Sequence, residues 1–294
     1  MLKTNTSHSK RAHFTNATVE LVKWPFNSSY SLDDKVLALQ TTRLSPQLSL
    51  NSSLTPSLNE QVSSAFGDFN LGMHVGDNAE RVTYNRNVLN RFISQQLFNK
   101  TVKSNTQLID EVKIQWLEQV HGNEVVTITS VDEQARVADA SITSQKNIVL
   151  AIMTADCLPI LLSHKTGSEV AAIHGGWRPL VANIIAKTIA KMNSQPSDIV
   201  AWLGPCIGKN AFEVGSEVKL AFTQLDVAFA NAFVKQANGK YLADLHQIAR
   251  LQLVSLGVTV INSLAECTYQ ETEKYYSYRR KKITGRMASL ICRR

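Results

Sequence analysis

The sequence is organised around the stretch Ile148-Val-Leu-Ala-Ile-Met-Thr-Ala-Asp156-Cys157-Leu-Pro-Ile-Leu-Leu-Ser-His164. Two runs within it, 148–153 and 159–162, are continuously apolar, which is typical of strands that are buried on both faces. An acid and a thiol lie between these runs. Burying the Asp156 carboxylate without a partner would cost roughly several kcal/mol, so we expect hydrogen-bond donors or a positive charge beside it. The stretch therefore predicts a functional site between two buried strands.

Length and composition describe a globular protein that can build a large core. The chain has 294 residues, of which 44% are hydrophobic and 19% are charged. The formal net charge is +7, and the basic residues are scattered except for Arg279-Arg280-Lys281-Lys282 and the final Arg293-Arg294. No basic stripe alternates with aromatic residues, which argues against nucleic-acid binding. A moderate positive field favours a small anionic substrate such as phosphate.

The cysteines and the N-terminal residues indicate the cellular compartment in which the protein is expected. The four cysteines lie far apart and form no CxxC pair, which argues against a disulfide framework and against a structural zinc ribbon. Residues 1–16 are polar, and we expect a disordered leader there, followed by a single catalytic domain over 17–294. No run has the apolar length of a signal peptide or a membrane span. We expect a cytoplasmic protein with no membrane partner, and a monomer.

Hydrophobic periodicity predicts an alternation of strands and helices. We expect strands over 36–43, 112–120 and 201–204 and a last strand at the C-terminus. We expect helices over 77–97 and 179–192, and mostly helical structure over 216–256. Residues 44–64 are rich in Ser, Asn and Pro and have no period, so we expect a long loop. The glycines of 66–77 predict a backbone held close to another group.

Three metal-ligating side chains stand at the ends of apolar strands: His121, Cys157 and His174. A catalytic zinc takes about three protein ligands, commonly His or Cys, and keeps one position open. A single buried cysteine is more often a packing residue, so the spacing by itself leaves a metal site and a structural role both open. His74 is a fourth candidate, in a glycine-rich loop with Asn70, and a solvated loop histidine explains it equally well. The other histidines are assigned to helix packing, a surface turn or the leader: His246, His164, His8 and His13.

Six segments carry the signatures of one family, in that family's order: Phe69-Asn70-Leu71-Gly72 with His74 and Gly76-Asp77, Gln119-Val120-His121-Gly122, Thr154-Ala155-Asp156-Cys157-Leu158-Pro159, His174-Gly175-Gly176-Trp177-Arg178, Gly204-Pro205-Cys206-Ile207-Gly208, and Ser277-Tyr278-Arg279-Arg280 before Thr284-Gly285-Arg286. Together they resemble the laccase-domain family, whose members were named polyphenol oxidases and are now mostly described as purine nucleoside phosphorylases with adenosine deaminase activity. The resemblance covers residues 36–292. The segment after Arg43, Pro179 and Lys209-Asn210 depart from the family pattern, which leaves the rim of the pocket and the substrate preference open.

The resemblance implies an α+β fold, a single compact domain of layered mixed β-sheets flanked by helices. It implies a metal ion, usually zinc, on His121, Cys157 and His174, which copper could also occupy adventitiously because such ligands bind Cu(II) more tightly than Zn(II). The implied partners are phosphate and a purine nucleoside, namely adenosine, inosine, guanosine or methylthioadenosine. The implied reactions are phosphorolysis to a free base and a sugar phosphate, and deamination of adenosine.

The chemistry of these reactions suggests roles for further residues. Deamination needs an activated water at the purine C6, and zinc lowers the pKa of a water that it binds towards about 7; Asp156 or His74 would carry the proton. Phosphorolysis passes through an oxocarbenium-like sugar and needs phosphate held in place. The candidates for binding phosphate or substrate are Arg43, Asn70, Arg178, Arg279 and Arg286, and the candidate catalytic residues are Asp156, Cys157 and His74.

Three other functions compete with this interpretation. A copper-dependent polyphenol oxidase of the laccase type needs many histidines, mostly in His-x-His pairs, whereas this chain has seven histidines and no such pair. A metal-free hydrolase or transferase could use Cys157 as its nucleophile, with His121 or His174 as the base. A non-catalytic protein that binds a nucleotide or a metal would use the same residues without turnover.

Overall fold

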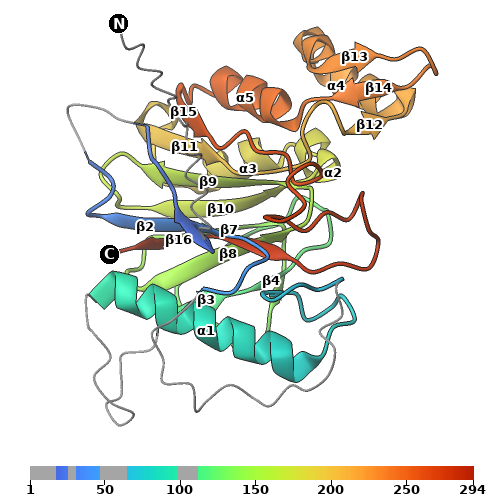
Figure 1. Ribbon diagram of the computed structural model, residues 1–294. Helices are drawn as coiled ribbons and strands as arrows, with labels where there is room; N and C mark the ends of the chain where they lie inside the picture. Colours follow the sequence, from blue (N-terminus) through green and yellow to red (C-terminus); the bar gives the residue numbers. More distant parts are fainter. Residues whose placement is uncertain (1–17, 26–30, 47–64, 99–111) are drawn as a thin grey trace, which may run out of the picture.

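The fold is a stack of four layers, in which two β-sheets lie face to face between helices (Figure 1). A computed structural model describes residues 18–25, 31–46, 65–98 and 112–294. The expected leader over 1–16 lies outside these ranges, as does most of the loop expected over 44–64. The expectation of layered mixed sheets flanked by helices in a single compact domain is confirmed.

The first sheet has five strands in the order β1-β2-β16-β8-β3. Its strands are β1 (Val19–Leu21), β2 (Val36–Thr41), β16 (Met287–Arg293), β8 (Ile148–Thr154) and β3 (Lys113–Gln115). Neighbouring strands are antiparallel except β3 and β8, which are parallel. Helix α1 (Ala79–Phe98) covers the outer face of this sheet.

The second sheet has six strands in the order β15-β11-β9-β10-β7-β5. Its strands are β15 (Val260–Ser263), β11 (Ile199–Leu203), β9 (Leu158–His164), β10 (Val170–Gly175), β7 (Ala140–Thr143) and β5 (Val125–Thr127). Its outer face packs against α2 (Trp177–Val181), α3 (Ile184–Lys191) and α5 (Leu245–Ser255). No helix in the described ranges is both long enough and apolar enough to cross a membrane.

The buried strands are apolar on both faces because each face belongs to a different core. Along β8, Leu150 and Ile152 pack between the two sheets, whereas Val149 and Ala151 pack beneath α1. Leu161 of β9 meets the side chains of β8 in the core between the sheets. The continuous apolar runs of the sequence therefore reflect a strand sandwiched on both sides.

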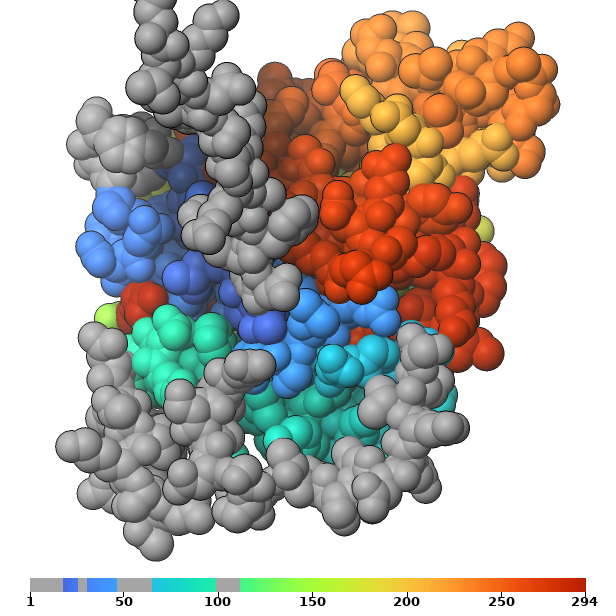
Figure 2. Space-filling view, viewed as in Figure 1, coloured from blue at the N-terminus to red at the C-terminus, as the bar shows by residue number. Residues whose placement is uncertain are grey.

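A small lobe stands out from the stack, drawn in orange in Figures 1 and 2. Its elements are β12 (Glu213–Val214), α4 (Ser216–Leu225), the 3-10 helix η3 (Val227–Ala232), β13 (Phe233–Lys235) and β14 (Tyr241–Ala243). The prediction of mostly helical structure over 216–256 is wrong for β13 and β14, which form an antiparallel hairpin. Asn238-Gly239 is a typical hairpin turn, and Gly239 has a φ of 81°. The Asn238-Gly239 turn therefore favours a hairpin at a place where the apolar spacing suggests a helix.

Two other predicted elements are each divided in two. The strand expected over 112–120 is β3 followed by β4 (Leu117–Glu118), and β4 pairs with β6 (Arg136–Val137) rather than with β8. The helix expected over 179–192 is α2 and α3, separated at Asn183, whose φ of 61° is left-handed. Asparagine tolerates that conformation better than most residues. A further 3-10 helix, η2 (Pro196–Asp198), precedes β11.

The chain crosses from one sheet to the other at residues 155–157, between β8 and β9. Asp156 adopts a φ of 105° at this crossing, a conformation that is rare outside glycine. Because β10 runs antiparallel to β9, the end of β10 returns to the crossing, and His174 pairs with Pro159. The topology thus places Cys157 beside His174.

Leu39 and Leu21 are partners across the β1–β2 ladder, but Leu39 is 1% exposed and Leu21 is 57% exposed. We expect Leu39→Ala to lower the free energy of unfolding by about 2–5 kcal/mol, because it empties a filled position beneath α1. The matched control, Leu21→Ala, should change it by less than about 0.5 kcal/mol. Urea unfolding measures both, and equal losses would contradict this placement of the core.

Candidate active site

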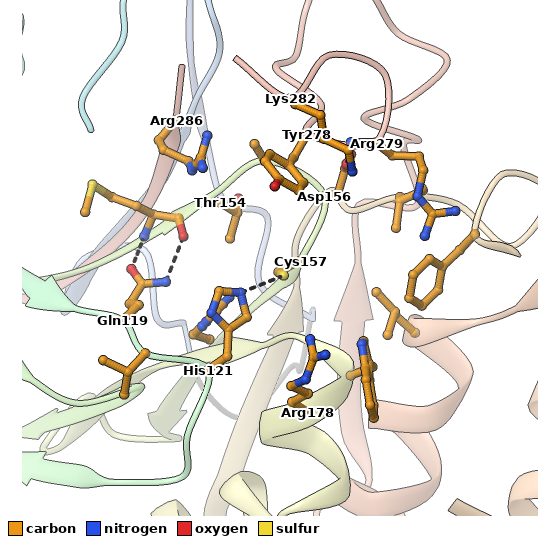
Figure 3. A pocket seen from close by; sticks show the side chains of 18 of the residues that line it. Gln119, His121, Thr154, Asp156, Cys157, Arg178, Tyr278, Arg279, Lys282 and Arg286 are labelled. Carbon is orange, nitrogen blue, oxygen red and sulfur yellow. Dashed lines mark hydrogen bonds between the residues drawn. The ribbon is translucent and has the colours of Figure 1, made fainter. Parts of the chain in front are cut away.

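A pocket of about 750 Å³ lies at the crossing between the two sheets (Figure 3). Its wall is built by the loop before α1, the turn after β4, the crossing at 155–157, the start of α2 and residues from the segment 278–286. The volume falls within the range of small-molecule sites, about 300–1,000 Å³. Segments from His74 to Arg286 therefore converge on one cavity.

His121, Cys157 and His174 come together in the wall of this pocket, as the sequence predicts. One ligand atom from each lies within 4.8 Å of the others, and the Cys157 Sγ is 3.9 Å from the His121 Nε2. His121 has a left-handed φ of 60° in the turn after β4, which directs its ring towards the crossing. These three side chains could hold a metal ion.

Asp139 orients the His174 ring and holds the backbone of the turn at His121 and Gly122. One of its carboxylate oxygens accepts a hydrogen bond from the His174 Nδ1 at 2.7 Å and from the His121 backbone N–H at 3.0 Å, and the other accepts from the Gly122 N–H at 2.6 Å. Burial acts to raise the pKa of Asp139, but His174 and the two amides lower it. The His174 Nε2 is thereby left to face Cys157. Sequence reasoning assigned no role to Asp139, because nothing in the chain indicates its distance from His174.

Charge within the triad is divided between the thiol and an imidazole. Burial acts to raise the pKa of Cys157, but the His174 and His121 rings outweigh burial and lower it to about 6. Burial acts to lower the pKa of His174, but the Cys157 sulfur and the Asp139 carboxylate raise it to about 9. In the metal-free protein at neutral pH, the pair is therefore a thiolate beside an imidazolium. A cation that displaces the His174 proton would meet the Cys157 sulfur already as the thiolate that binds metal.

Asp156 has the hydrogen-bond donors that its burial demands. The Thr268 hydroxyl donates to Oδ1 at 2.7 Å, and the Arg279 backbone N–H donates to Oδ2 at 2.6 Å. Burial raises the pKa of Asp156 despite these bonds. Because both oxygens are engaged, the carboxylate ties the crossing to the turn at 277–280, which carries pocket residues.

Five of the predicted site residues join the triad in the pocket wall: His74, Asp156, Arg178, Arg279 and Arg286. The Arg178 guanidinium carbon lies 4.5 Å from the centre of the Trp177 ring, and that of Arg279 lies 5.3 Å from the Phe212 ring. Their roles towards phosphate or substrate stay predictions.

The structure does not bring Arg43 and Asn70 into the pocket wall. The Arg43 guanidinium donates to the Thr272 carbonyl oxygen at 2.7 Å and lies over the Tyr276 ring. The Asn70 side chain is buried and bonds to the backbone of Gly72 and to Asp77. Arg43 and Thr272 are separated by 229 positions in the chain, so the sequence alone does not indicate their contact.

Several pocket residues had no role in the sequence analysis: Gln119, Trp177, Phe212, Tyr278 and Lys282. Gln119 makes two hydrogen bonds of 2.8 Å with the backbone of Met153, which fasten the end of β8 beside His121. The signal for Gln119, Trp177 and Tyr278 was their place within the family segments. Phe212 and Lys282 gave no such signal.

We expect Asp139→Asn to weaken zinc binding by about ten-fold to 100-fold, because the amide cannot accept from the His174 Nδ1 and both backbone N–H groups as the carboxylate does. Asp132→Asn is the matched control, since Asp132 is exposed and bonds to Arg136. Competition with a chromogenic chelator gives the dissociation constants. Equal affinities for wild type and Asp139→Asn would show that Asp139 does not support the site.

In the metal-free protein we expect alkylation of Cys157 by iodoacetamide to have its midpoint near pH 6, because its pKa is about 6. Below that pH the thiol is protonated and the rate falls; above it the rate levels off, whereas alkylation of an ordinary thiol has its midpoint at about pH 8.5 and still rises above it. Added zinc should protect Cys157. Cys292, whose pKa burial raises to about 12, is the internal control and should stay unmodified. Mass spectrometry of the peptides measures both, and a Cys157 rate that climbs beyond pH 8 would contradict the charge assignment.

Curated relatives share much of the chain. A protein of Escherichia coli (strain K12) named purine nucleoside phosphorylase YfiH is 44% identical over 226 residues, which cover 77% of this chain and 86% of that protein. A protein of Pseudomonas aeruginosa named purine nucleoside phosphorylase PA4543 is 39% identical over 228 residues, which cover 77% of this chain and 86% of that protein.

Solved structures share the fold. The crystal structure of protein NMB0706 from Neisseria meningitidis has a TM-score of 0.77 at 35% identity and covers 94% of this chain and 99% of that one. The crystal structure of YlmD from Geobacillus stearothermophilus has a TM-score of 0.69 at 26% identity, covering 88% and 92% respectively. The family model described as multi-copper polyphenol oxidoreductase laccase matches residues 58–294, a range that contains the whole pocket wall. The chain therefore belongs to this laccase-domain family.

Proposed function

We propose that this protein is a cytoplasmic, zinc-dependent purine nucleoside phosphorylase that also deaminates adenosine. Its substrates would be phosphate and adenosine, inosine, guanosine or methylthioadenosine. The observation that carries the proposal is the cluster of His121, Cys157 and His174 in a pocket that also holds guanidinium groups and aromatic rings. The names of the relatives from E. coli and P. aeruginosa support the phosphorylase activity.

The donor set of the pocket suits zinc. A tetrahedral zinc separates its sulfur and nitrogen ligand atoms by about 3.5 Å, and the Cys157 Sγ lies 3.9 Å from the His121 Nε2. Three protein ligands leave one position open for substrate or water, as in catalytic zinc sites. When bound, zinc would polarise an oxygen and stabilise the negative charge that develops on it.

Phosphorolysis exchanges one bond for another at C1′ of the ribose. A phosphate oxygen forms the new bond to C1′, and the C1′–N9 bond breaks with its electron pair going to the purine, which takes up a proton. The rings of Trp177 and Phe212 offer faces on which a purine can stack. Arginines of the pocket wall would neutralise phosphate through paired N–H donors. The products are a free base and ribose 1-phosphate.

His74 is better placed than Asp156 to move a proton. Both oxygens of Asp156 already accept hydrogen bonds within the protein, whereas His74 is an exposed residue of the pocket wall. Burial, Arg286 and Arg86 lower the pKa of His74, so its ring is mostly neutral at pH 7. A neutral imidazole accepts at one nitrogen and donates at the other. In deamination it would take the proton of the attacking water and return it to the leaving ammonia.

The copper-dependent polyphenol oxidase has less support. Within the described residues, the ligand groups that could hold a metal form one cluster of three, whereas a multicopper oxidase needs several. A single copper ion would still suit these ligands.

A metal-free thiol nucleophile is the second candidate. The short distance from the Cys157 Sγ to the His121 Nε2, 3.9 Å, and the lowered pKa of Cys157 both fit a nucleophile with its base. Metal analysis of protein purified without added metal separates the two candidates, because retained activity in zinc-free protein would favour the nucleophile.

We expect incubation with inosine or methylthioadenosine to release free base only when phosphate is present. Cys157→Ala should lower the rate by at least about 100-fold, because it removes a metal ligand. Cys292→Ala is the control, since Cys292 lies on β16 outside the pocket wall, and its rate should match the wild type. Chromatography of the free base measures the reaction, and equal release without phosphate would refute the phosphorylase assignment.

A further inference from the structure

The pocket has two sides of different chemistry. In Figure 3, Arg286 and Gln119 lie on one side of Cys157, and Arg178 lies on the other. The Arg178 side is a stacking surface, because the guanidinium lies over the Trp177 ring, 4.5 Å from its centre. The Arg286 side is a positively charged surface.

Arg286 carries a positive charge in the pocket wall; burial lowers its pKa, and the charges of Cys157 and Asp156 act to raise it. Its Nη1 donates to the carbonyl oxygens of Thr284 and Gly285 at 2.9 and 3.0 Å. None of the ion pairs within the described residues involves Arg286. A half-buried guanidinium with no carboxylate in contact has lost part of its hydration without an ion pair to replace it. Such a site favours an anionic ligand.

Arg86 adds a second charge to the same corner. Its Nε donates to the Leu71 carbonyl oxygen at 3.0 Å, and its guanidinium lies over the Trp116 ring, 4.0 Å from the centre. Arg86 also takes part in none of the ion pairs of the described ranges. After burial, Arg286 and Arg86 are the causes that lower the pKa of His74, and they outweigh Glu118, which acts to raise it.

The Phe69–Gly72 segment clamps Arg286. The Asn70 Oδ1 accepts the backbone N–H groups of Arg286 and Gly72 at 2.8 and 3.0 Å. A Cβ on Gly72 would lie 2.9 Å from the Arg286 Cγ, so any larger residue would displace that side chain. Asn70 also donates to Asp77 at 2.9 Å, which fastens the clamp to the loop before α1.

Thr154 adds a buried hydroxyl to the same wall. It lines the pocket, is 2% exposed, and its Oγ1 has no hydrogen-bond partner within the described part of the chain. Thr154 pairs with Met287 across the β8–β16 ladder, and Met287 is the residue that follows Arg286 in the chain. Buried polar groups without partners are uncommon. A phosphate oxygen would provide an acceptor after a rotation about the Cα–Cβ bond.

We propose that Arg286, His74 and Thr154 form the phosphate subsite, that Asn70 and Gly72 position it, and that the purine stacks on the opposite side. The subsite rests on the proposed function, since phosphate is its co-substrate. The ribose C1′ then lies between the two sides, beside Cys157. This arrangement accounts for the Phe69–Gly72 motif, whose Asn70 is a positioning residue and does not bind substrate.

Steady-state kinetics with phosphate and inosine varied separately test the subsite. We expect Arg286→Gln to raise the KM for phosphate about ten-fold or more and to change the KM for inosine less than about two-fold. Arg286→Lys should recover part of the loss, because it restores the charge without the paired donors. Lys281→Gln is the matched control: it removes a charge from the same segment at an exposed residue outside the pocket wall, and both KM values should stay unchanged.

Two further variants separate position from charge. Gly72→Ala keeps the Arg286 charge but moves its side chain, and should also raise the KM for phosphate. Arg178→Gln should raise the KM for inosine instead. Thermal unfolding of each variant shows whether it is folded as the wild type is.

Calorimetric titration of inorganic phosphate distinguishes failure of the subsite from failure of the proposed function. If the wild type is a phosphorylase but Arg286→Gln keeps its KM for phosphate, the subsite is wrong and the activity stands. If base release does not depend on phosphate, the proposed function fails. In that case weaker phosphate binding by Arg286→Gln would still support an anion subsite, and equal binding by both proteins would overturn it.

Discussion

The buried carboxylate of Asp156 is the constraint on which the rest of the site depends. It sits where the chain leaves one sheet for the other, in a backbone conformation with a φ of 105° that few residues adopt. Its hydrogen bonds to Thr268 and Arg279 bring the C-terminal basic segment against the crossing. Because the crossing itself carries Cys157, the Asp156 carboxylate fixes both the position of the thiol and the turn at 277–280, which lines the pocket.

Asp139 is a second buried carboxylate that positions metal-ligating residues. A single carboxylate accepts from the His174 ring and from the His121 backbone N–H, so it fixes the His174 imidazole and the turn that carries His121. The negative charge also supports a cationic His174 when metal is absent, which keeps the Cys157 thiolate neutralised. The site is therefore held together electrostatically before any metal ion binds, and binding would need little reorganisation.

The basic residues of the pocket divide by their surroundings. Arg178 and Arg279 lie over aromatic rings, where a guanidinium adds to a flat surface on which a purine can stack. Arg286 lies farther from a ring, 5.9 Å from the centre of Tyr278. Its guanidinium is held by the carbonyl oxygens of Thr284 and Gly285, with its backbone N–H bonded to Asn70. A nucleoside and phosphate would meet on opposite sides of Cys157 if each found the surface that suits it. This difference between the arginines depends on neighbours from distant segments of the chain. The sequence around each arginine does not indicate it.

The sequence by itself determined the buried strands that contain the apolar runs 148–153 and 159–162 and the helix that begins near Asp77, because apolar runs and caps are local properties. It offered His121, Cys157 and His174 as candidate ligands, which the family resemblance grouped into one site and the sheet topology brings together. It misjudged the hairpin of the small lobe, although Asn238-Gly239 was a readable turn signal. Only the tertiary structure decided that Asp139 orients His174, that Arg43 bonds to Thr272 outside the pocket wall, and that Asn70 holds Arg286. These contacts join residues 35, 229 and 216 positions apart, and no local pattern encodes which distant segments the sheets bring together.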